Sequence, residues 1–543
     1  MFLTNLLTAV TSIIPSVGEI ANISVRYEWI CNIIAGIISF AGDVGLGIIL
    51  FTVILKLITL APDIWSRVSM KKNALKMEAM KEDLEKLQKQ YAKNKDLYQQ
   101  KMMALYKKNG YSAFSACLPT IITLVFFFIV IGAFNSYSQV SERNIFAGMR
   151  ESYNQALETE ANRENSSLSV GSDGKYYINY DNVFSAKGIS DCFTGSSNDY
   201  AVDKTKAAKL IEIYGESVKK ILNEDGTLNS SYKPFKDILE SEVNSVLVEK
   251  ALGAGLKDEL ISIEAIEEID GKCYILNESE FWKKCADLCN KYSDCVIYDE
   301  EKATYATNYD ALIQNADFSA AKAAYEAQAD EKLTPELFNV IEKAESEEVK
   351  STARAAAAEW YKGKDNKARS VIFPWVKNIW AADCSWTTAI PASTAELNQK
   401  IKGLNISEVD YNELTYNLSE FKEKGFKNGN GWFILVALSI LSMLGSTVIM
   451  NKTQKTQMQL SSVEGDSSTA ASTQKMMTWM MPIMFGIFAF IYSAAFSIYM
   501  ITNSLLSTGS TQLINLIVEK SFKKKLEKAE KEKIENHKYG KMR

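Results

Sequence analysis

The sequence predicts an all-α integral membrane core of five transmembrane helices with a cytoplasmic helical hairpin, plus a large extracytoplasmic, mainly helical inserted domain. The first observation is a set of apolar runs of about 18 residues or more, each long enough to cross a ~30 Å hydrocarbon core as a helix. The second is a polar stretch between them, about residues 137–430, with 50 Asp and Glu against 34 Lys and Arg. This stretch carries −16, whereas the whole chain carries −5, so the remainder is basic at +11.

The N-terminal region, residues 1–43, is predicted to be extracytoplasmic. It ends in an apolar segment at 28–41, in which Trp29 suits the boundary between lipid and water. We therefore expect a helix lying on the surface of the bilayer. Gly42 and Asp43 are expected to break this helix before the first crossing.

Residues 44–61 are predicted to form the first transmembrane helix, which Pro62 ends. A cytoplasmic helical hairpin is predicted to follow at 62–112, because apolar residues recur on one helical face and a polar run at 93–96 interrupts them. The apolar positions are Met70, Met77, Met80, Leu84, Leu87 and Tyr91 in the first arm, and Leu97, Met102, Leu105 and Tyr106 in the second.

The remaining apolar runs predict four further crossings. A Ser- and Thr-rich stretch separates the third from the fourth, and a strongly basic stretch follows the fifth. The predicted segments are transmembrane helices at 113–136, 431–450, 476–494 and 495–518, a cytoplasmic loop at 451–475, and a basic cytoplasmic tail at 519–543.

Orientation follows from the lysine and arginine residues near the crossings. The hairpin carries 12 of them and the tail carries 10, whereas the segment before residue 44 has only Arg26. The sequence therefore predicts a multi-pass protein of the cell membrane with its N-terminus outside and its C-terminus in the cytoplasm. This alternation places the acidic domain at 137–430 outside.

The cysteines favour the same placement. Cys31 and Cys117 fall in or beside apolar segments, and the other six of the eight lie in the acidic domain. An even number confined to one region is typical of disulfides in an oxidising compartment, although the sequence cannot choose among the pairings. A metal site is the disfavoured alternative, because the spacing is not C-x₂-C and His537 is the only histidine. The disulfide candidates are Cys192, Cys273, Cys285, Cys289, Cys295 and Cys384.

The acidic domain reads as mainly helical, with helices expected at 204–222, 234–252 and 335–361. Asp173 and Gly174 precede a Tyr-Tyr-Ile run, which is typical of a hairpin turn. No repeat is visible in this domain.

Lys56 is a charge inside an apolar crossing. Such a residue costs ~2.5–3.5 kcal/mol at the centre of a bilayer. One interpretation is a lysine that extends toward the membrane surface. The other is a wetted groove that receives a carboxylate from outside, because the remaining crossings contain no Asp or Glu to pair with it.

Polar residues also concentrate in the third and fifth crossings. Serine and threonine commonly hydrogen-bond between packed helices, whereas Asn503 and Gln512 are costlier in lipid and more suggestive of function. The residues are Ser439, Ser442, Ser446 and Thr447 in the third crossing, and Thr502, Asn503, Ser504, Ser507, Thr508, Ser510, Thr511 and Gln512 in the fifth.

Several motifs, in order, resemble the YidC-type membrane protein insertases. They cover about residues 29–139 and 370–518, and their order and spacing carry the resemblance. They are ILFTVILKLITLAP (Ile49 to Pro62), LYKKNG (Leu105 to Gly110), ACLP (Ala116 to Pro119), FPWVKNIWAAD (Phe373 to Asp383), KMMTWMMPIMFGIFAF (Lys475 to Phe490), IYMITN (Ile498 to Asn503) and Gln512.

The chain departs from the pattern of that family at several positions. Lys56 stands where the family usually has Arg, and Thr123 stands where it usually has Gln. Ala116 replaces the glycine of Gly-Cys-Leu-Pro, and residues 493–495 replace a Pro-x-Gly. The insertion at about 140–369 interrupts the core after its second helix.

The resemblance implies a chaperone that is not an enzyme and uses no cofactor or metal. Nascent membrane-protein clients would insert through a hydrophilic groove within the bilayer, lined by Lys56, Thr123, Asn503 and Gln512. Expected partners are these clients, the lipid bilayer, a protein-translocation channel, and the ribosome through the basic tail. That tail is equally well explained as a solvated, positive-inside segment.

Two other functions remain open on the sequence. In a small-anion transporter or channel, Lys56 would bind the anion, but internal repeats are absent. In a membrane-anchored adhesion or signalling protein, the external domain would be the working part, but one crossing would suffice. No nucleotide-binding loop, zinc site or catalytic triad is recognisable.

Overall fold

The computed structural model describes residues 13–91, 94–110, 114–195, 200–453, 480 and 483–540. The described chain is mostly helical, as predicted, and forms two compact units. We call Met1–Ser16 with Asn154–Ala353 the inserted unit, and Val17–Tyr153 with Arg354–Arg543 the core unit. Residues 354–430, predicted as part of the external domain, thus cluster with the helices of the core unit.

The core unit begins with the predicted surface helix, α1 (Glu28–Ala41). Gly42 ends it in the left-handed conformation (φ 71°), and its N–H bonds to the carbonyl of Ile38. Asp43 then starts α2 (Val44–Gln90) by accepting a hydrogen bond from the N–H of Leu46 at 2.9 Å.

The prediction that the helix ends at Pro62 is wrong, because α2 continues through it for 28 more residues. A proline removes one backbone donor, and the rest of a long helix can retain its hydrogen bonds. In the described part of the chain, one helix, Val44–Trp65, is long and apolar enough to cross a membrane, with a mean hydropathy of 2.4. Glu28–Ala41 and Ile434–Ile449 are apolar but shorter.

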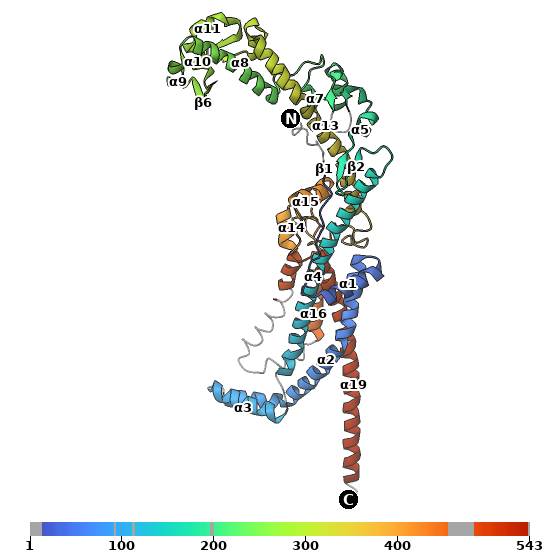
Figure 1. Ribbon diagram of the computed structural model, residues 1–543. Helices are drawn as coiled ribbons and strands as arrows, with labels where there is room; N and C mark the ends of the chain where they lie inside the picture. The colour runs from blue at the N-terminus through green and yellow to red at the C-terminus, as the bar shows by residue number, and fades with distance from the viewer. Residues whose placement is uncertain are drawn as a thin grey trace. The chain divides into compact units, whose positions relative to one another are not determined.

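The predicted hairpin is confirmed. Asn94 starts α3 (Lys95–Lys108) by accepting from the N–H of Leu97, and α3 folds back on α2 (Figure 1). Met80 and Leu84 of α2 and Tyr106 of α3 are buried together, with Met102 and Leu105 packed against them. The side chains of Met70 and Met77 lie outside the described residues.

The other long helices run past their predicted ends. The second predicted crossing is part of α4 (Phe114–Ala161), and the third corresponds to α16 (Ile434–Thr453). Residues 483–491 are helical. The helix is interrupted at Ser493, as predicted, and α19 (Ala494–Gly540) follows. Because α19 continues to Gly540, the segments predicted as the fifth crossing and as the basic tail lie in one helix. Most of the predicted loop at 451–475 lies outside the described residues.

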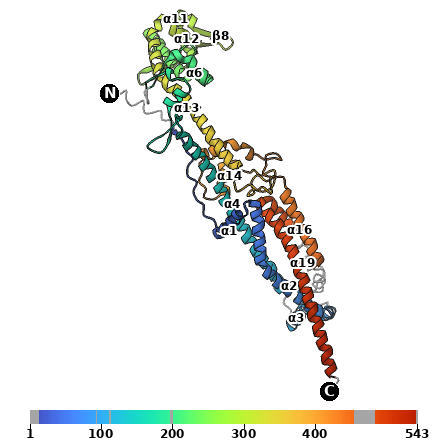
Figure 2. The ribbon, with the colours of Figure 1, turned by 90° about the vertical axis from the view of Figure 1, so that its right-hand side faces the viewer.

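Within the core unit, α19 packs against both α2 and α16, and α1 packs against α2 (Figures 1 and 2). Aromatic side chains connect the helices. Phe134 of α4 lies 5.7 Å, between ring centroids, from both Phe51 of α2 and Tyr499 of α19. Phe127 of α4 lies 4.6 Å from Phe485, which belongs to the helical residues 483–491.

The inserted unit is built from short elements around helices α8 and α13. The turn predicted at Asp173 and Gly174 is confirmed, with φ 73° at Gly174, in a three-stranded sheet of order β1-β3-β2. The helix predicted at 204–222 is instead divided at Gly215, which has φ 60°. The helices predicted at 234–252 and 335–361 are confirmed as parts of α8 and α13.

The elements from the first strand to α13 are β1 (Ile13–Ile14), β2 (Leu168–Val170), β3 (Tyr176–Ile178), α5 (Tyr180–Ala186), η1 (Ser190–Cys192), β4 (Phe193–Thr194), β5 (Ala201–Val202), η2 (Lys204–Lys206), α6 (Ala207–Tyr214), α7 (Glu216–Lys219), α8 (Lys233–Gly253), α9 (Lys257–Ser262), β6 (Ile266–Ile269), β7 (Lys272–Ile275), α10 (Glu278–Lys284), α11 (Ala286–Lys291), η3 (Ser293–Cys295), β8 (Val296–Asp299), β9 (Thr304–Thr307), α12 (Tyr309–Gln314), η4 (Ala316–Phe318) and α13 (Ser319–Lys362). Three short helices then precede α16: α14 (Thr394–Lys400), α15 (Glu408–Thr415) and η5 (Tyr416–Phe421).

The predicted disulfides are not formed among the described residues, where seven cysteines are all free thiols. Cys384 belongs to the core unit, and its Sγ lies 2.9 Å from Oγ1 of Thr387. The other five candidates belong to the inserted unit. Burial raises the pKa of Cys285 to about 11, which keeps it a protonated thiol at neutral pH. The part of the chain that is described also contains no cluster of His, Cys, Asp or Glu that could hold a metal ion.

Candidate functional site

An irregular segment of the core unit, residues 366–393, lies at the starts of three long helices. We call it the cap segment. It contains the FPWVKNIWAAD motif (Phe373 to Asp383) and has no regular helix or strand along its length. Hydrogen bonds connect the cap segment to the helices around it.

At the start of α2, the carboxylate of Asp43 binds the cap segment. Its Oδ1 accepts from Oγ of Ser370 at 2.8 Å, and its Oδ2 accepts from the N–H of Val371 at 2.6 Å. The approach is close, because a Cβ on Gly45 would lie 2.6 Å from Oγ of Ser370. One acidic residue thus both starts α2 and holds the cap segment.

At the start of α16, Asp383 of the cap segment plays the corresponding part. Its Oδ1 accepts from the N–H of Trp432 at 2.8 Å, and its Oδ2 accepts from the N–H of Leu435 at 2.6 Å. Asp383 is completely buried, and this burial raises the pKa of its carboxyl above 3.8 despite the opposing hydrogen bonds. A carboxylate at a helix N-terminus is stabilised by the unpaired N–H groups there.

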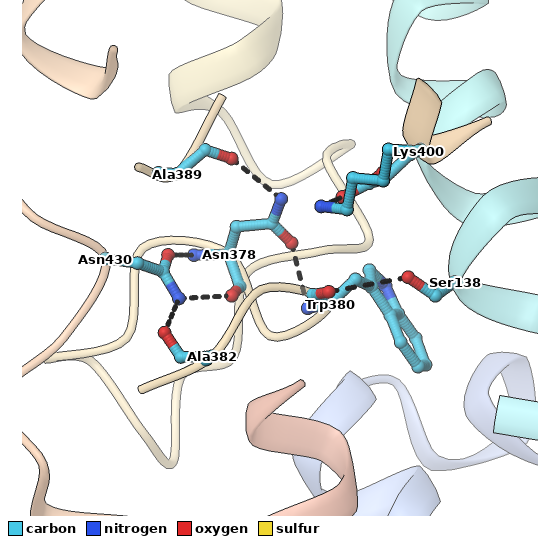
Figure 3. Close-up of polar contacts among 8 residues, drawn as sticks. Ser138, Asn378, Trp380, Ala382, Ala389, Lys400 and Asn430 are labelled. Atoms are coloured by element: carbon cyan, nitrogen blue, oxygen red, sulfur yellow. Dashed lines mark hydrogen bonds and ion pairs between the residues drawn. The ribbon is translucent and has the colours of Figure 1, made fainter. Parts of the chain in front are cut away.

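Two buried asparagines fix the backbone of the cap segment (Figure 3). Asn378 accepts from the N–H of Trp380 at 2.9 Å and donates to the carbonyl of Ala389 at 2.8 Å. Asn430, just before α16, accepts from the N–H of Asn378 at 2.8 Å and donates to the carbonyls of Asn378 and Ala382, both at 2.9 Å. Buried amides with satisfied partners hold a single backbone arrangement.

The cap segment also binds α19 and α4. The N–H groups of Ala494 and Ala495, which begin α19, donate to the carbonyls of Ala381 and Ile379 at 2.8 and 2.9 Å. Oγ of Ser138 on α4 donates to the carbonyl of Trp380 at 3.4 Å (Figure 3). Glu142, also on α4, pairs with Lys400 at the end of α14. The N-terminal ends of α2, α16 and α19 therefore meet at one segment, so these three helices start at the same end of the core unit.

Polar side chains join α16 and α19 along their length. Oγ of Ser504 donates to the carbonyl of Ser442 at 2.9 Å, and Oγ1 of Thr508 donates to Oγ of Ser446 at 2.6 Å. The expectation that serine and threonine hydrogen-bond between packed helices is therefore confirmed at these positions.

Lys56 has a partner in its own helix, so the expectation of an unpaired lysine is wrong. Its Nζ lies 2.6 Å from Oδ2 of Asp63, a residue of the predicted hairpin. Because α2 continues past Pro62, Asp63 lies about two turns further along the same helical face.

The other predicted groove residues are only partly brought together. Asn503 and Gln512 lie on α19, which packs against the helix that carries Lys56. Asn503 is half-buried and accepts from Oγ of Ser507 at 3.5 Å, whereas Gln512 is exposed. Among the described residues, no hydrogen bond or ion pair joins Lys56 to either. Thr123 lies on α4, and its side chain is outside the described residues.

Sequence reasoning missed the residues that hold the cap segment together, namely Asp43, Asp383, Asn378 and Asn430. Asp43 was assigned only the role of breaking a helix. For Asp383 and Asn378 a signal was available, because both lie in a motif that carried the family resemblance. No sequence signal marked Asn430, because its partners are backbone groups up to 52 residues away.

Comparison with known proteins adds independent information. The family model described as 60Kd inner membrane protein matches residues 36–155 and 320–521, leaving most of the inserted unit unmatched. Three similar proteins are each named membrane protein insertase YidC. The protein from Fusobacterium nucleatum is 30% identical over 97 residues, which are 18% of this chain and 45% of that protein. The protein from Clostridium perfringens is 33% identical over 93 residues, 17% of this chain and 37% of that protein.

The third, from Chlamydia caviae, is 34% identical over 95 residues, which are 18% of this chain and 12% of that protein. The chain thus spans less than half the length of the curated relatives it matches. No solved structure matches the chain.

Proposed function

The chain belongs to the 60Kd inner membrane protein family, and from this premise we propose that it is a membrane protein insertase. It inserts and folds nascent membrane proteins and catalyses no covalent reaction. The similar proteins bear the name of this activity, and the family match covers most of the core unit. Its place of action is the cell membrane.

The arrangement that carries the proposal is the meeting of α2, α16 and α19 at the cap segment. These helices correspond to the first, third and fifth predicted crossings. In a chain that crosses a membrane five times, odd-numbered crossings all start on the same side. Three N-terminal ends bound to one segment support this alternation. The positive charge of the hairpin and tail supports an outer position for the cap segment.

In the proposed mechanism, clients enter a hydrophilic groove from the cytoplasmic side, and the cap segment keeps its outer end closed. The groove shortens the apolar distance that a polar flank must cross. Lys56, Thr123, Asn503 and Gln512 are the proposed groove residues, with Lys56 acting on acidic flanks. Binding must stay weak so that the client can leave into the lipid.

The pairing of Lys56 with Asp63 weakens the alternative of a small-anion transporter. That alternative depended on a lysine with no carboxylate of its own. The ion pair satisfies the charge within the helix. The partners that we propose are nascent membrane proteins and the lipid bilayer, with the ribosome and a translocation channel as further candidates.

The test is insertion of a purified single-span client into vesicles with and without the protein. We expect the translocated flank to become protected from protease only in vesicles that contain the protein. The matched variant is Lys56→Arg, which restores the residue usual in the family and should insert an acidic-flank client as well as the native protein does. Equal protection in empty vesicles would contradict the proposed function.

A further inference from the structure

The ion pair between Lys56 and Asp63 lies inside Val44–Trp65, the one stretch of the described helices that is both long and apolar enough to cross a membrane. In Val44–Trp65, these two residues are the only charged ones. They are seven positions apart, which is within about 20° of two full helical turns. Nζ of Lys56 and Oδ2 of Asp63 are 2.6 Å apart. This stretch therefore has no net charge, and the one contact pairs both of its charged groups.

The two partners are buried to different extents. The side chain of Lys56 is 14% exposed, and that of Asp63 is 34% exposed. The lysine belongs to the apolar middle of the helix, whereas the aspartate follows Pro62, near the hairpin. Removing either charge leaves the other unpaired, and that cost is greater for the more buried group. Asp63 is thus the partner that can turn away into water while Lys56 stays in place.

We propose that Asp63 is a built-in occupant of the Lys56 anion site and that a client carboxylate displaces it. This inference rests on the proposed insertase function and concerns how binding at Lys56 is regulated. The exchange replaces one carboxylate by another, so the number of ion pairs on Lys56 is conserved. The step therefore requires no unpaired lysine in the apolar part of the helix.

A tethered competitor also selects among anions. Asp63 is attached to the same helix, so its effective concentration at Lys56 is high. A free carboxylate or chloride ion in solution cannot match that concentration. A carboxylate that a bound apolar client segment holds beside Lys56 can reach a comparable effective concentration. Lys56 can therefore bind an acidic group that is attached to a hydrophobic helix, whereas small anions in solution do not displace Asp63.

The experiment uses the full-length protein in vesicles and two synthetic single-span peptides, one with an aspartate and one with an asparagine in the flank. Each peptide carries a photo-crosslinking group beside that position. The readout is the ratio of crosslink yields, acidic peptide to neutral peptide. For Asp63→Asn, we expect this ratio to rise by about three-fold or more, because the lysine has lost its tethered competitor. Added acetate should lower the ratio in this variant but leave it unchanged in the native protein.

Three further variants make the test specific. Asp63→Glu keeps the competitor and should behave as the native protein does. The double variant Lys56→Met with Asp63→Asn removes both charges and should bring the ratio to about one, because neither peptide then meets a cation. Asp96→Asn on α3 removes a carboxylate outside the crossing and should leave the native ratio unchanged.

The proposal is overturned if Asp63→Asn leaves the ratio unchanged or lowers it, while thermal unfolding shows a folded protein. It is also overturned if Asp63→Asn unfolds and Asp63→Glu alters the ratio as strongly as the double variant does. These outcomes are distinct from failure of the proposed function. That failure appears as equal insertion of both peptides with and without the native protein, whatever the variants show.

Discussion

Asp43 and Ser370 are 327 residues apart in the chain and 2.8 Å apart in the structure, between Oδ1 of the first and Oγ of the second. The same carboxylate starts α2 and binds the cap segment. Asp43→Ala should therefore destabilise the core unit by more than an ordinary helix cap, for which the loss is ~0.5–2 kcal/mol. Thermal unfolding in detergent measures this. Ser370→Ala should cost less, and the double variant should cost less than the two losses combined, because the residues share a contact. Simple additivity would show that the contact contributes nothing.

Asp383 gives a prediction about pH. Burial raises the pKa of its carboxyl above 3.8, so the folded protein binds this proton more tightly than the unfolded chain does. The stability contributed by Asp383 should therefore fall as the pH rises from about 4 through the folded-state pKa, and stay constant above it. Asp383→Asn lacks this titration. The difference in unfolding temperature between native protein and variant should thus grow as the pH falls from 8 to 4, and a constant difference would contradict the assignment.

At pH 7, the same variant should be destabilised. An asparagine offers one acceptor oxygen where the carboxylate offers two, so the N–H of Trp432 or of Leu435 loses its partner. A buried donor left without a partner costs ~1–3 kcal/mol. Glu408→Gln, on the exposed side of α15, is the matched control and should unfold as the native protein does.

The cysteines allow a direct test. Alkylation of the folded protein, followed by mass spectrometry without reduction, should find Cys192, Cys285 and Cys295 unpaired and slow to react. Burial raises the pKa of each, and the thiolate is the reactive form. Cys273 is less buried and should react first. Disulfide-linked peptides among these cysteines would instead restore the interpretation drawn from composition.

The inserted unit should be removable at defined residues. Oη of Tyr153 and Nε of Arg354 both contact Oε2 of Glu413, at 3.3 and 2.7 Å, so the ends left by deleting 154–353 lie close together. This deletion, closed by a short Gly-Ser linker, should leave a core unit that integrates into membranes and unfolds cooperatively.

A wider deletion, residues 141–368, is the informative comparison. It removes Glu142, which pairs with Lys400, as well as Arg354 and the close contact between Gly148 and Trp360. We expect this deletion to lose stability, which differential scanning fluorimetry can compare with the narrower one. Equal stability of the two proteins would show that residues 141–153 and 354–368 add nothing to the core unit.

The sequence predicted those features that depend on local pattern. The helix predicted at 28–41, before the break at Gly42 and Asp43, agrees in its bounds with α1. The hairpin predicted from the spacing of apolar residues corresponds to the second part of α2 together with α3. It failed where a local signal competes with tertiary packing. Pro62 reads as an end of a helix, yet α2 continues, and this error hid the partner of Lys56. The even number of cysteines in the acidic domain likewise could not reveal that the six disulfide candidates are free thiols.

The structure of the cap segment could not be predicted from local sequence patterns. Asn378, Asp383 and Asn430 are polar residues in an irregular stretch, and nothing in their spacing indicates that they are buried. Their partners are backbone groups of distant residues, which pair only once the helices have assembled. Only the resemblance of the surrounding motif to a known family marked the stretch as important.

The uninterrupted course of α19 has a mechanical consequence. Its 47 residues span roughly 70 Å at 1.5 Å per residue, from the contact of Ala494 with the cap segment to the basic tail. The helix is unbroken from Ala494 to Gly540 and includes no proline. One continuous helix therefore connects the lysines of the tail with the hydrogen bonds at Ser504 and Thr508 and with the contact between Ala494 and Ala381. A displacement of the tail along its axis would therefore act directly on the cap segment, about 70 Å away.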